Sequence, residues 1–238
     1  MKNIFLLMSI LLSSPVPAVV LKYNSCPVLQ MRVGYTGLEG VQKKVDDAVF
    51  QSLVRYKSSD TTQMNKTLRK FQDFLPTIST NKIINDIHAI DSIFESLPEL
   101  PYGLLLFRGS TLNFRQNRPY EVNEVGQEWT YTSTTLNILS AYKYAQPKVQ
   151  KDRGQILVYY FAVDADRKAI AVCDPVDEEV LLPRRISFKV MDTLRLNEDT
   201  RISLSLVQIC NPKGSCEDSI RKDVQRQWVD LKVNQLHY

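Results

Sequence analysis

The spacing of apolar residues changes near Pro101, and this change constrains the fold more than any other feature of the 238-residue chain. Before Pro101, apolar residues recur every three or four positions, which is the spacing of helices that bury one face. Beyond it, short apolar or alternating runs typical of strands dominate. Helices that come first and strands that follow predict an α+β domain with an N-terminal helical lobe.

The same patterns give approximate positions for the individual elements. Helices are predicted at 38–56, 62–75, 82–97, 136–144 and 217–231. Strands are predicted at 104–107, 128–132, 155–163, 169–172, 180–182, 186–190 and 202–209. Pro98 and Pro101 end the third helix, because a proline interrupts helical hydrogen bonding.

The first eighteen residues have the pattern of a secretory signal peptide. Lys2 supplies the basic start, an apolar run extends from Ile4 to Leu12, and a Val-x-Ala triplet ends at Ala18. The apolar run is well short of the ~20 residues that a bilayer-spanning helix requires. We therefore expect cleavage after Ala18, a secreted product without stable membrane insertion, and one folded domain over residues 19–238.

The four cysteines acquire a structural meaning in an exported chain. An even number of cysteines in an oxidising compartment predicts two disulfides, with three connectivities to choose from. Cys26 lies near the start of the mature chain, and Cys210 and Cys216 lie near its end. The preferred pairing therefore ties the N-terminal arm to the C-terminal part, and Cys173 is an alternative candidate for a buried free thiol.

Charge and motifs exclude several classes of function. The net charge is +4 and acidic residues are interleaved with basic ones, so nucleic-acid binding is not expected. The phosphate-binding motifs Gly-x-Gly-x-x-Gly and Gly-x4-Gly-Lys-Ser/Thr are missing, as are Gly-x-Ser-x-Gly and His-Glu-x-x-His. Without Cys-x-x-Cys, and with two histidines in all, the chain offers no zinc-ligand spacing, so no metal is expected.

Three short segments carry groups suited to chemistry, each at the end or edge of a predicted strand. The apolar strand 104–107 runs into Arg108 and Gly109, and the strand 128–132 runs into three consecutive hydroxyl residues. An acidic cluster at 177–179 directly precedes the apolar strand 180–182. Taken singly, these segments also fit a solvated arginine, a helix cap and a turn.

In this order, the three segments resemble the arginine, serine, glutamate signature of the mono-ADP-ribosyltransferase family, which includes exported bacterial toxins and animal ecto-enzymes. The resemblance covers about residues 104–190. It implies two packed antiparallel sheets after the helical lobe, with NAD bound in the cleft between them. It also implies that the protein, expected to be a monomer, cleaves the nicotinamide bond of NAD and passes ADP-ribose to a protein side chain.

The resemblance assigns a role to each signature residue. Glu179 would stabilise the positive charge that develops on the ribose, and Ser133 would orient the Glu179 carboxylate. Arg108 would bind the NAD pyrophosphate, because a planar guanidinium matches phosphate geometry, or would hold the site together. The main chain of Gly109 would hold the nicotinamide amide. Ser133, Thr134 and Thr135 would also belong to the NAD site, with the two threonines supporting the end of the strand.

Asp177 departs from the family pattern and leaves the acceptor open. The position two residues before the catalytic glutamate is usually Glu in relatives that modify arginine and Gln in those that modify asparagine. Asp177 keeps a carboxylate that can act as a general base, with a reach shorter by one methylene. We expect arginine as the acceptor, with a secreted NAD glycohydrolase as the first alternative and an inactive binding module as the second. The diphtheria-like branch places a histidine on the first strand, whereas His88 falls in a predicted helix.

Overall fold

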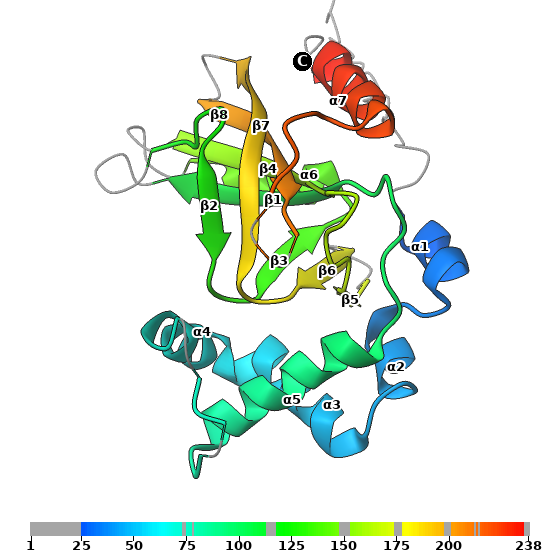
Figure 1. Ribbon diagram of the computed structural model, residues 1–238, viewed down its shortest axis with the longest axis vertical. Coiled ribbons are helices and arrows are strands. Elements are labelled where there is room, and N and C mark those ends of the chain that lie inside the picture. Colours follow the sequence, from blue (N-terminus) through cyan, green and yellow to red (C-terminus); the bar gives the residue numbers. More distant parts are fainter. Residues whose placement is uncertain are drawn as a thin grey trace, which may run out of the picture.

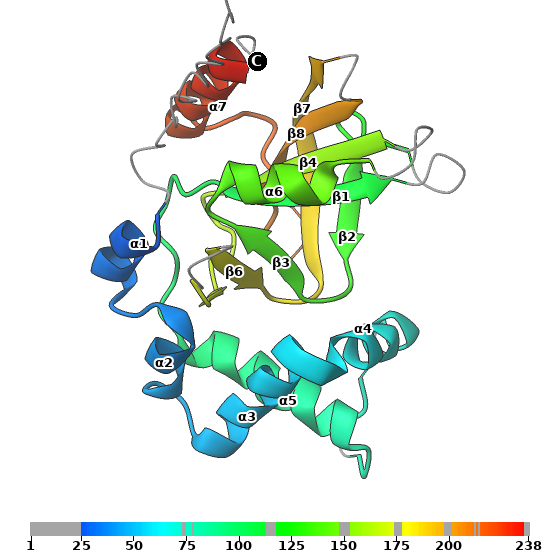
Figure 2. The same ribbon diagram turned by 180° about the vertical axis from the view of Figure 1, so that it is seen from behind.

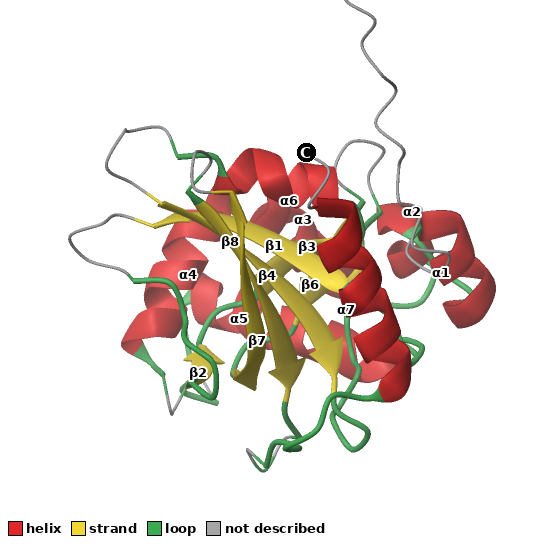
Figure 3. Cartoon of the chain, turned by 90° about the horizontal axis from the view of Figure 1, so that it is seen from above, coloured by secondary structure: helices red, strands yellow, loops and turns green. Residues whose placement is uncertain are grey.

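The computed structural model describes residues 25–72, 75–77, 79–112, 118–147, 153–173, 178–197, 201–211, 213 and 215–235. These residues form a central sheet with helices on both sides (Figures 1 and 3). The N-terminal helices pack against one face, and α6 (Ile138–Ala145) and α7 (Lys222–Gln235) pack against the other. The α+β class and the N-terminal helical lobe predicted from the sequence are confirmed.

The lobe contains more helices than the sequence pattern predicted. Its elements are α1 (Cys26–Val33), α2 (Gly37–Gln42), α3 (Asp47–Arg55), the π-helical turn η1 (Tyr56–Asp60), α4 (Thr61–Lys70) and α5 (Lys82–Ser96). The single helix predicted at 38–56 is interrupted, because the Lys44 amide bonds to Val41 O and closes a turn before α3. Helix α1 was not predicted, although Pro27 in its first turn and left-handed Gly34 after its end are ordinary helix-boundary signals.

In the described part of the chain, eight strands form one continuous hydrogen-bonded sheet, in the order β2-β7-β8-β4-β1-β3-β6-β5. The strands are β1 (Leu106–Leu112), β2 (Val125–Glu128), β3 (Thr132–Thr135), β4 (Arg153–Phe161), β5 (Ile170–Ala171), β6 (Glu179–Leu182), β7 (Ile186–Asn197) and β8 (Ile202–Ile209). The two separate antiparallel sheets implied by the resemblance are thus joined, and the β4–β8 pair is parallel. β1 pairs with β4 along its whole length but with β3 only at Phe107 and Thr135. This narrow junction lets β3, β6 and β5 turn away from the other strands (Figure 1).

The central strand β4 is buried on both faces, which explains its uninterrupted apolar sequence. Leu157, Tyr159 and Phe161 face the core beneath the helical lobe, whereas Ile156 and Val158 face the core beneath α6 and α7. Successive strand residues point to opposite faces, so both cores draw on one strand. The regular spacing of β4 and its neighbours therefore fixes the directions of the side chains on β1.

Gly109 allows α6 to lie directly across β1 and β4 (Figure 2). A Cβ atom at Gly109 would lie only 1.7 Å from the carbonyl oxygen of Ala141 on α6. Any larger residue would push the helix off the sheet. The α7 helix closes the same core with the buried side chain of Trp228. Within the described part of the chain, no helix is long and apolar enough to cross a bilayer.

Two disulfides are present, as the cysteine count predicted, but the preferred pairing was wrong. Cys26 is bonded to Cys173, and Cys210 is bonded to Cys216. The short loop after β8 turns back through a bond from the Asn211 amide to Ser215 O, which brings Cys210 and Cys216 together. Cys26 at the start of α1 instead reaches the segment that follows β5. Cys173 is accordingly not a free thiol.

Candidate active site

Glu179 is the first residue of β6 and lies beside β3. Thr135 is its register partner, and Ser133 projects to the same face of β3 because strand side chains alternate. The Ser133 hydroxyl donates a hydrogen bond to Glu179 Oε1. Only 7% of Glu179 is exposed to solvent. The structure thus brings together the serine and the glutamate of the signature, with one carboxylate oxygen oriented by the serine.

The second oxygen of this carboxylate contacts a residue that the sequence analysis missed. Lys57 Nζ forms a hydrogen bond and an ion pair with Glu179 Oε2. Lys57 belongs to η1, 122 residues away along the chain, and the helical pattern around it gave no sign of this contact. The Lys57 side chain is 28% exposed and that of Glu179 is 9% exposed, so the pair lies at the edge of the buried region.

The two threonines after Ser133 fix the end of β3. Thr134 Oγ1 donates to Val180 O at 2.5 Å and so adds a side-chain bond to the β3–β6 pairing. Thr135 Oγ1 accepts a hydrogen bond of 2.9 Å from the Asn137 amide. The cap of α6 is Asn137, whose side chain accepts from the Leu139 amide, so the hydroxyl residues are not the cap itself.

The segment before Glu179 is closed by backbone contacts at both of its ends. The Cys173 amide donates to Glu179 O at 2.9 Å, and the Leu136 amide donates to Glu178 O at 3.2 Å. Cys173 and Glu178 both have positive φ angles, 48° and 47°, which L-residues adopt infrequently. Asp177, the predicted acceptor-specifying residue, lies in the stretch 174–177, outside the described residues.

Arg108 lies on β1 and forms no ion pair with Glu179, whose partner is Lys57. Side chains alternate along β1, with Leu106 in the core beneath the lobe and Phe107 in the opposite core, so Arg108 faces the lobe. Burial raises the pKa of Tyr56, and the positive charge of Arg108 partly offsets this rise. Among the described residues, no carboxylate or hydrogen-bond acceptor pairs with the Arg108 guanidinium.

A polar cluster from the helical lobe accompanies Arg108. Asn65 on α4 hydrogen-bonds to the Tyr56 hydroxyl and lowers its pKa, although less than burial raises it. Asn65 Oδ1 is buried and has no hydrogen-bond partner within the described part of the chain. Because an unpaired buried acceptor costs about 1–3 kcal/mol, we expect this oxygen to accept from a donor outside the described residues, either water or a ligand. Tyr56 and Asn65 were not predicted as site residues, because both fall in predicted helices that carry no recognisable motif.

A second set of contacts anchors β3 and β6 to the lobe. Arg184, just after β6, donates to both carboxylate oxygens of Asp91 on α5 at 2.7–3.1 Å. The Tyr131 hydroxyl, just before β3, lies 2.8 Å from Asp91 Oδ1. Burial raises the pKa of Tyr131 well above its ordinary value, and the Asp91 charge raises it further, so this hydroxyl stays protonated. These bonds hold the strands of Ser133 and Glu179 in place against α5.

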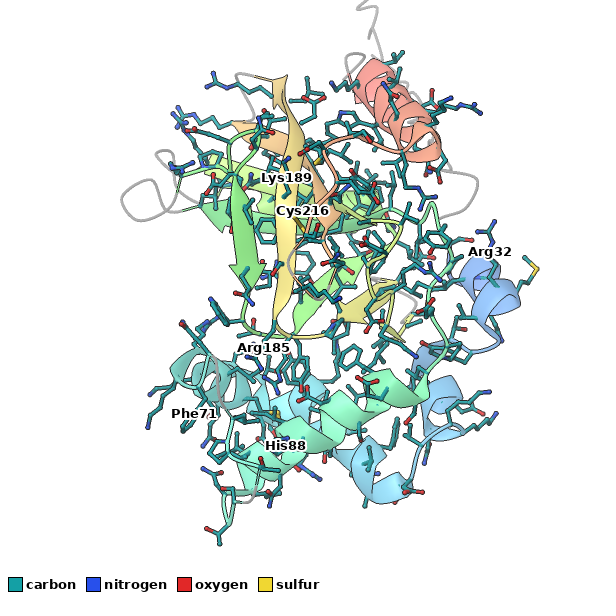
Figure 4. The ribbon with its side chains drawn as sticks, viewed as in Figure 1. Arg32, Phe71, His88, Arg185, Lys189 and Cys216 are labelled. Atoms are coloured by element: carbon teal, nitrogen blue, oxygen red, sulfur yellow. A yellow bond between two sulfur atoms is a disulfide. The ribbon has the colours of Figure 1, made fainter. Side chains whose placement is uncertain are left out.

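Two hollows lined by described residues lie away from Glu179. One of about 650 Å³ is lined by residues that include four arginines, Arg118, Arg153, Arg195 and Arg201. Another of about 320 Å³ includes Arg184 and Arg185, and Arg185 lies where the sheet faces the lobe (Figure 4). Neither contains Ser133, Arg108 or Glu179, whose carboxylate is covered by Lys57 and Ser133.

The histidine and the two tryptophans considered in the sequence lie outside the contacts around Glu179. His88 lies on α5 in the lobe, with Nε2 2.8 Å from Pro76 O (Figure 4). The first strand carries Arg108 instead of a histidine, as predicted. Trp228 is a core residue whose ring nitrogen donates to Asp192 Oδ2 at 2.8 Å, and Trp129 is half-buried.

Comparisons with known proteins agree on one fold and one family. No curated protein sequence matches the chain. Among solved structures, the Vis toxin, an ADP-ribosyltransferase from Vibrio splendidus, has 15% identity and a TM-score of 0.53, over 73% of this chain and 77% of that one. An ADP-ribosyltransferase from Clostridium botulinum has 19% identity and a TM-score of 0.54, over 72% of this chain and 91% of that one.

Exoenzyme S from Pseudomonas aeruginosa, solved with carba-NAD and human 14-3-3 protein beta, has 18% identity and a TM-score of 0.53, over 80% of this chain and 88% of that one. At these identities the structures establish the fold. Residues 34–211 match the family model described as ADP-ribosyltransferase exoenzyme, and this match covers most of the chain. The chain therefore belongs to the ADP-ribosyltransferase exoenzyme family.

Proposed function

We propose that this protein is an exported enzyme that cleaves the nicotinamide bond of NAD and transfers ADP-ribose to arginine side chains of a protein. Family membership supports the general reaction. The observation that carries the assignment to this site is the buried carboxylate of Glu179, oriented by Ser133. A fixed carboxylate beside the anomeric carbon stabilises the positive charge that forms there.

The proposed reaction breaks one bond and forms another at the same ribose carbon. Nicotinamide leaves with the electron pair of the C1′–N bond, and the ribose becomes positively charged. Glu179 stabilises this charge and accepts a hydrogen bond from the ribose 2′-hydroxyl, while Ser133 holds the carboxylate. A guanidine nitrogen of the acceptor then bonds to C1′ and loses a proton, which Asp177 accepts. Thr134 and Thr135 keep the end of β3 in position.

The residues around Arg108 suit the rest of NAD. A guanidinium that no described residue pairs with is available to the diphosphate, and Asn65 Oδ1 is available to a donor of the ligand. β1 pairs with β3 only at Phe107. The main chain of β1 near Gly109 therefore presents a sheet edge on this side, with which an amide can form hydrogen bonds. We assign this edge to the nicotinamide amide. The requirement for glycine itself is explained by α6, which leaves no room for a side chain.

The acceptor and the location rest on separate observations. A solved structure of the Vis toxin contains agmatine, a small arginine analogue, which supports a guanidine acceptor for a relative with 16% identity. The shorter carboxylate at Asp177 favours NAD hydrolysis as the second candidate, in which water replaces the guanidine. Two disulfides fit an oxidising compartment and support export, with the signal peptide at 1–18 lying outside the described residues.

Two assays on the purified, oxidised protein test the proposal. Release of nicotinamide from NAD establishes the enzymatic class, and mass spectrometry of agmatine after incubation detects the ADP-ribosyl adduct. We expect both products. Nicotinamide without an adduct would replace the transferase with the glycohydrolase. A folded protein that releases no nicotinamide is not an enzyme of this kind, and the inactive module would then be the correct description.

A further inference from the structure

Both oxygens of the Glu179 carboxylate already have a partner within the protein. Ser133 donates to Oε1 and the Lys57 ammonium contacts Oε2, while the glutamate side chain is 9% exposed. The role of Glu179 requires access of a ribose hydroxyl to a carboxylate oxygen and a net negative charge beside C1′. Each oxygen keeps a second lone pair, but the Lys57 ammonium covers Oε2 and offsets the negative charge. The Lys57 contact therefore competes with the proposed role of Glu179.

We propose that Lys57 is a positioning residue that serves as the counter-ion of Glu179 in the NAD-free protein and withdraws when the NAD ribose takes its place. This inference rests on the proposed function of Glu179. Lys57 keeps a buried carboxylate ionised and in its reactive position, because an unpaired charge in such a place is strongly unfavourable. The ribose then inherits a carboxylate that is already ionised and oriented.

The position of Lys57 allows this withdrawal. Its side chain is 28% exposed, and a four-carbon stem with a strongly hydrated ammonium can move into solvent without moving the backbone. It lies on η1, a five-residue π-helical turn between α3 and α4. Such turns are rare within helices and occur frequently at functional sites. Ser133, in contrast, is held by the paired strand β3 and stays with the glutamate.

Among the groups around Glu179, Lys57 is the one whose charge most directly affects the titration of this carboxylate. η1 contributes Lys57 and Tyr56, β3 contributes the uncharged hydroxyls of Ser133 and Thr135, and Glu178 precedes Glu179 in the chain. The positive charge of Arg108 on β1 lowers the pKa of Tyr56, and Arg108 forms no ion pair with the glutamate. Lys57 is the cation that pairs with Glu179 among the described residues, so its removal changes the titration of this carboxylate directly.

The test compares two pH profiles of nicotinamide release by Lys57→Gln. The acid limb of kcat/KM reports the free enzyme, and that of kcat reports the NAD complex. Loss of a nearby cation raises the pKa of a carboxylate, so the limb of kcat/KM should move to higher pH by about one to two units. The limb of kcat should not move, because Lys57 has already left Glu179 in that complex.

Matched variants separate charge from structure. Lys57→Arg restores the cation and should return the limb of kcat/KM to its wild-type position. Lys66→Gln removes an exposed lysine from α4 in the same lobe and should move neither limb. Thermal melting of each variant establishes that it is folded. If both limbs move in Lys57→Gln, Lys57 stays on Glu179 during turnover and the withdrawal is wrong.

If neither limb moves while the wild type is active, the counter-ion role is wrong. An inactive wild-type protein would instead refute the proposed function, and the inference can still be tested by carbon NMR of labelled glutamate side chains, with Glu179 assigned through Glu179→Gln. In the NAD-free protein, Lys57→Gln should raise the Glu179 titration midpoint by the same one to two units. An unchanged midpoint would overturn the inference without reference to activity.

Discussion

The two charged ends of the candidate site, Glu179 and Arg108, are built in opposite ways. Glu179 is almost fully buried, and its carboxylate is engaged by a serine from β3 and a lysine from η1. Arg108 has no ion-pair or hydrogen-bond partner in the described part of the chain, and near it Asn65 Oδ1 is unpaired as well. Contacts within the protein hold Glu179 in place, whereas the polar groups at the Arg108 end have no partner among the described residues. We call these the organised end and the Arg108 end.

Under the proposed function, this difference separates the residues that act in catalysis from those that bind NAD. A carboxylate fixed by neighbouring strands needs no reorganisation when charge develops in the transition state, so it acts mainly on kcat. Unpaired donors and acceptors gain their partners when the substrate binds, so they act mainly on KM. Variants at the two ends should therefore affect different kinetic constants.

The largest expected effect is at the organised end. Glu179→Gln keeps the size of the side chain and its contact with Ser133 but removes the negative charge. We expect kcat for nicotinamide release to fall by about 10³, with KM for NAD little changed. Glu178→Gln, at the adjacent carboxylate, is the matched control and should leave kcat unchanged. An equal loss at Glu178 would mean that the overall charge of the segment matters, and not the atom beside β3.

The next effect concerns the covalent support of the same end. Cys173 is bonded to Cys26, and its backbone amide donates a hydrogen bond to Glu179 O. The Cys210–Cys216 bridge lies in a separate loop. Chain entropy predicts that loss of the first bridge, with a separation of 147 residues, destabilises the protein by about 5 kcal/mol. For the second bridge, with a separation of 6, the same estimate is about 2 kcal/mol.

Urea unfolding of the two double serine variants measures these losses, and nicotinamide release provides a second readout. The variant without Cys26–Cys173 should also have a lower kcat, since the bridge holds the segment that leads into β6. The variant without Cys210–Cys216 should keep its kcat. Equal losses of stability, or an effect on kcat in the second variant alone, would mean that the Cys26–Cys173 bridge does not support the site.

Local patterns placed Ser133 and Glu179 beside predicted strands, and the resemblance to the family signature singled them out as a pair. Ser133 and Glu179 stand where predicted strands begin or end, and pairing between β3 and β6 brings them together. The lobe and most strands were predictable because hydrophobic periodicity is a local property. The strand predicted at 128–132 was wrong, since β2 ends at Glu128 and β3 begins at Thr132. The exact sheet arrangement was not, since the single register pair between β1 and β3 depends on how distant strands pack.

The contacts that the sequence did not predict all join distant segments. Lys57 reaches Glu179 only because η1 packs near β6, and nothing in a helical pattern specifies that partner. Cys26 meets Cys173 because α1 lies beside the segment after β5, whereas position along the chain suggested a C-terminal partner. No local pattern marks Asn65, whose buried oxygen is unpaired among the described residues because of how α4 packs in the folded protein.

A smaller effect is expected at Asp177, between the two ends in function. If Asp177 accepts the proton of the guanidine, Asp177→Asn should lower transfer to agmatine by about 10², the lower range for a positioned general base. Nicotinamide release without agmatine should be spared, because bond breaking depends on Glu179. Asp177→Glu should keep or raise transfer through its longer reach. Unchanged transfer in both variants would assign Asp177 to the turn alone.

The smallest effect is expected at the Arg108 end. It shows whether NAD binding needs the paired donors of a guanidinium or only a positive charge. Arg108→Lys keeps the positive charge but loses the planar pair of donors that matches a diphosphate. We expect KM for NAD to rise about tenfold, equivalent to about 1.4 kcal/mol, with kcat nearly unchanged. Arg195→Lys, at an exposed position on β7, is the control and should change neither constant. If Arg108→Lys lowers kcat and leaves KM alone, Arg108 acts on the transition state, and the division of the site into a catalytic end and a binding end fails.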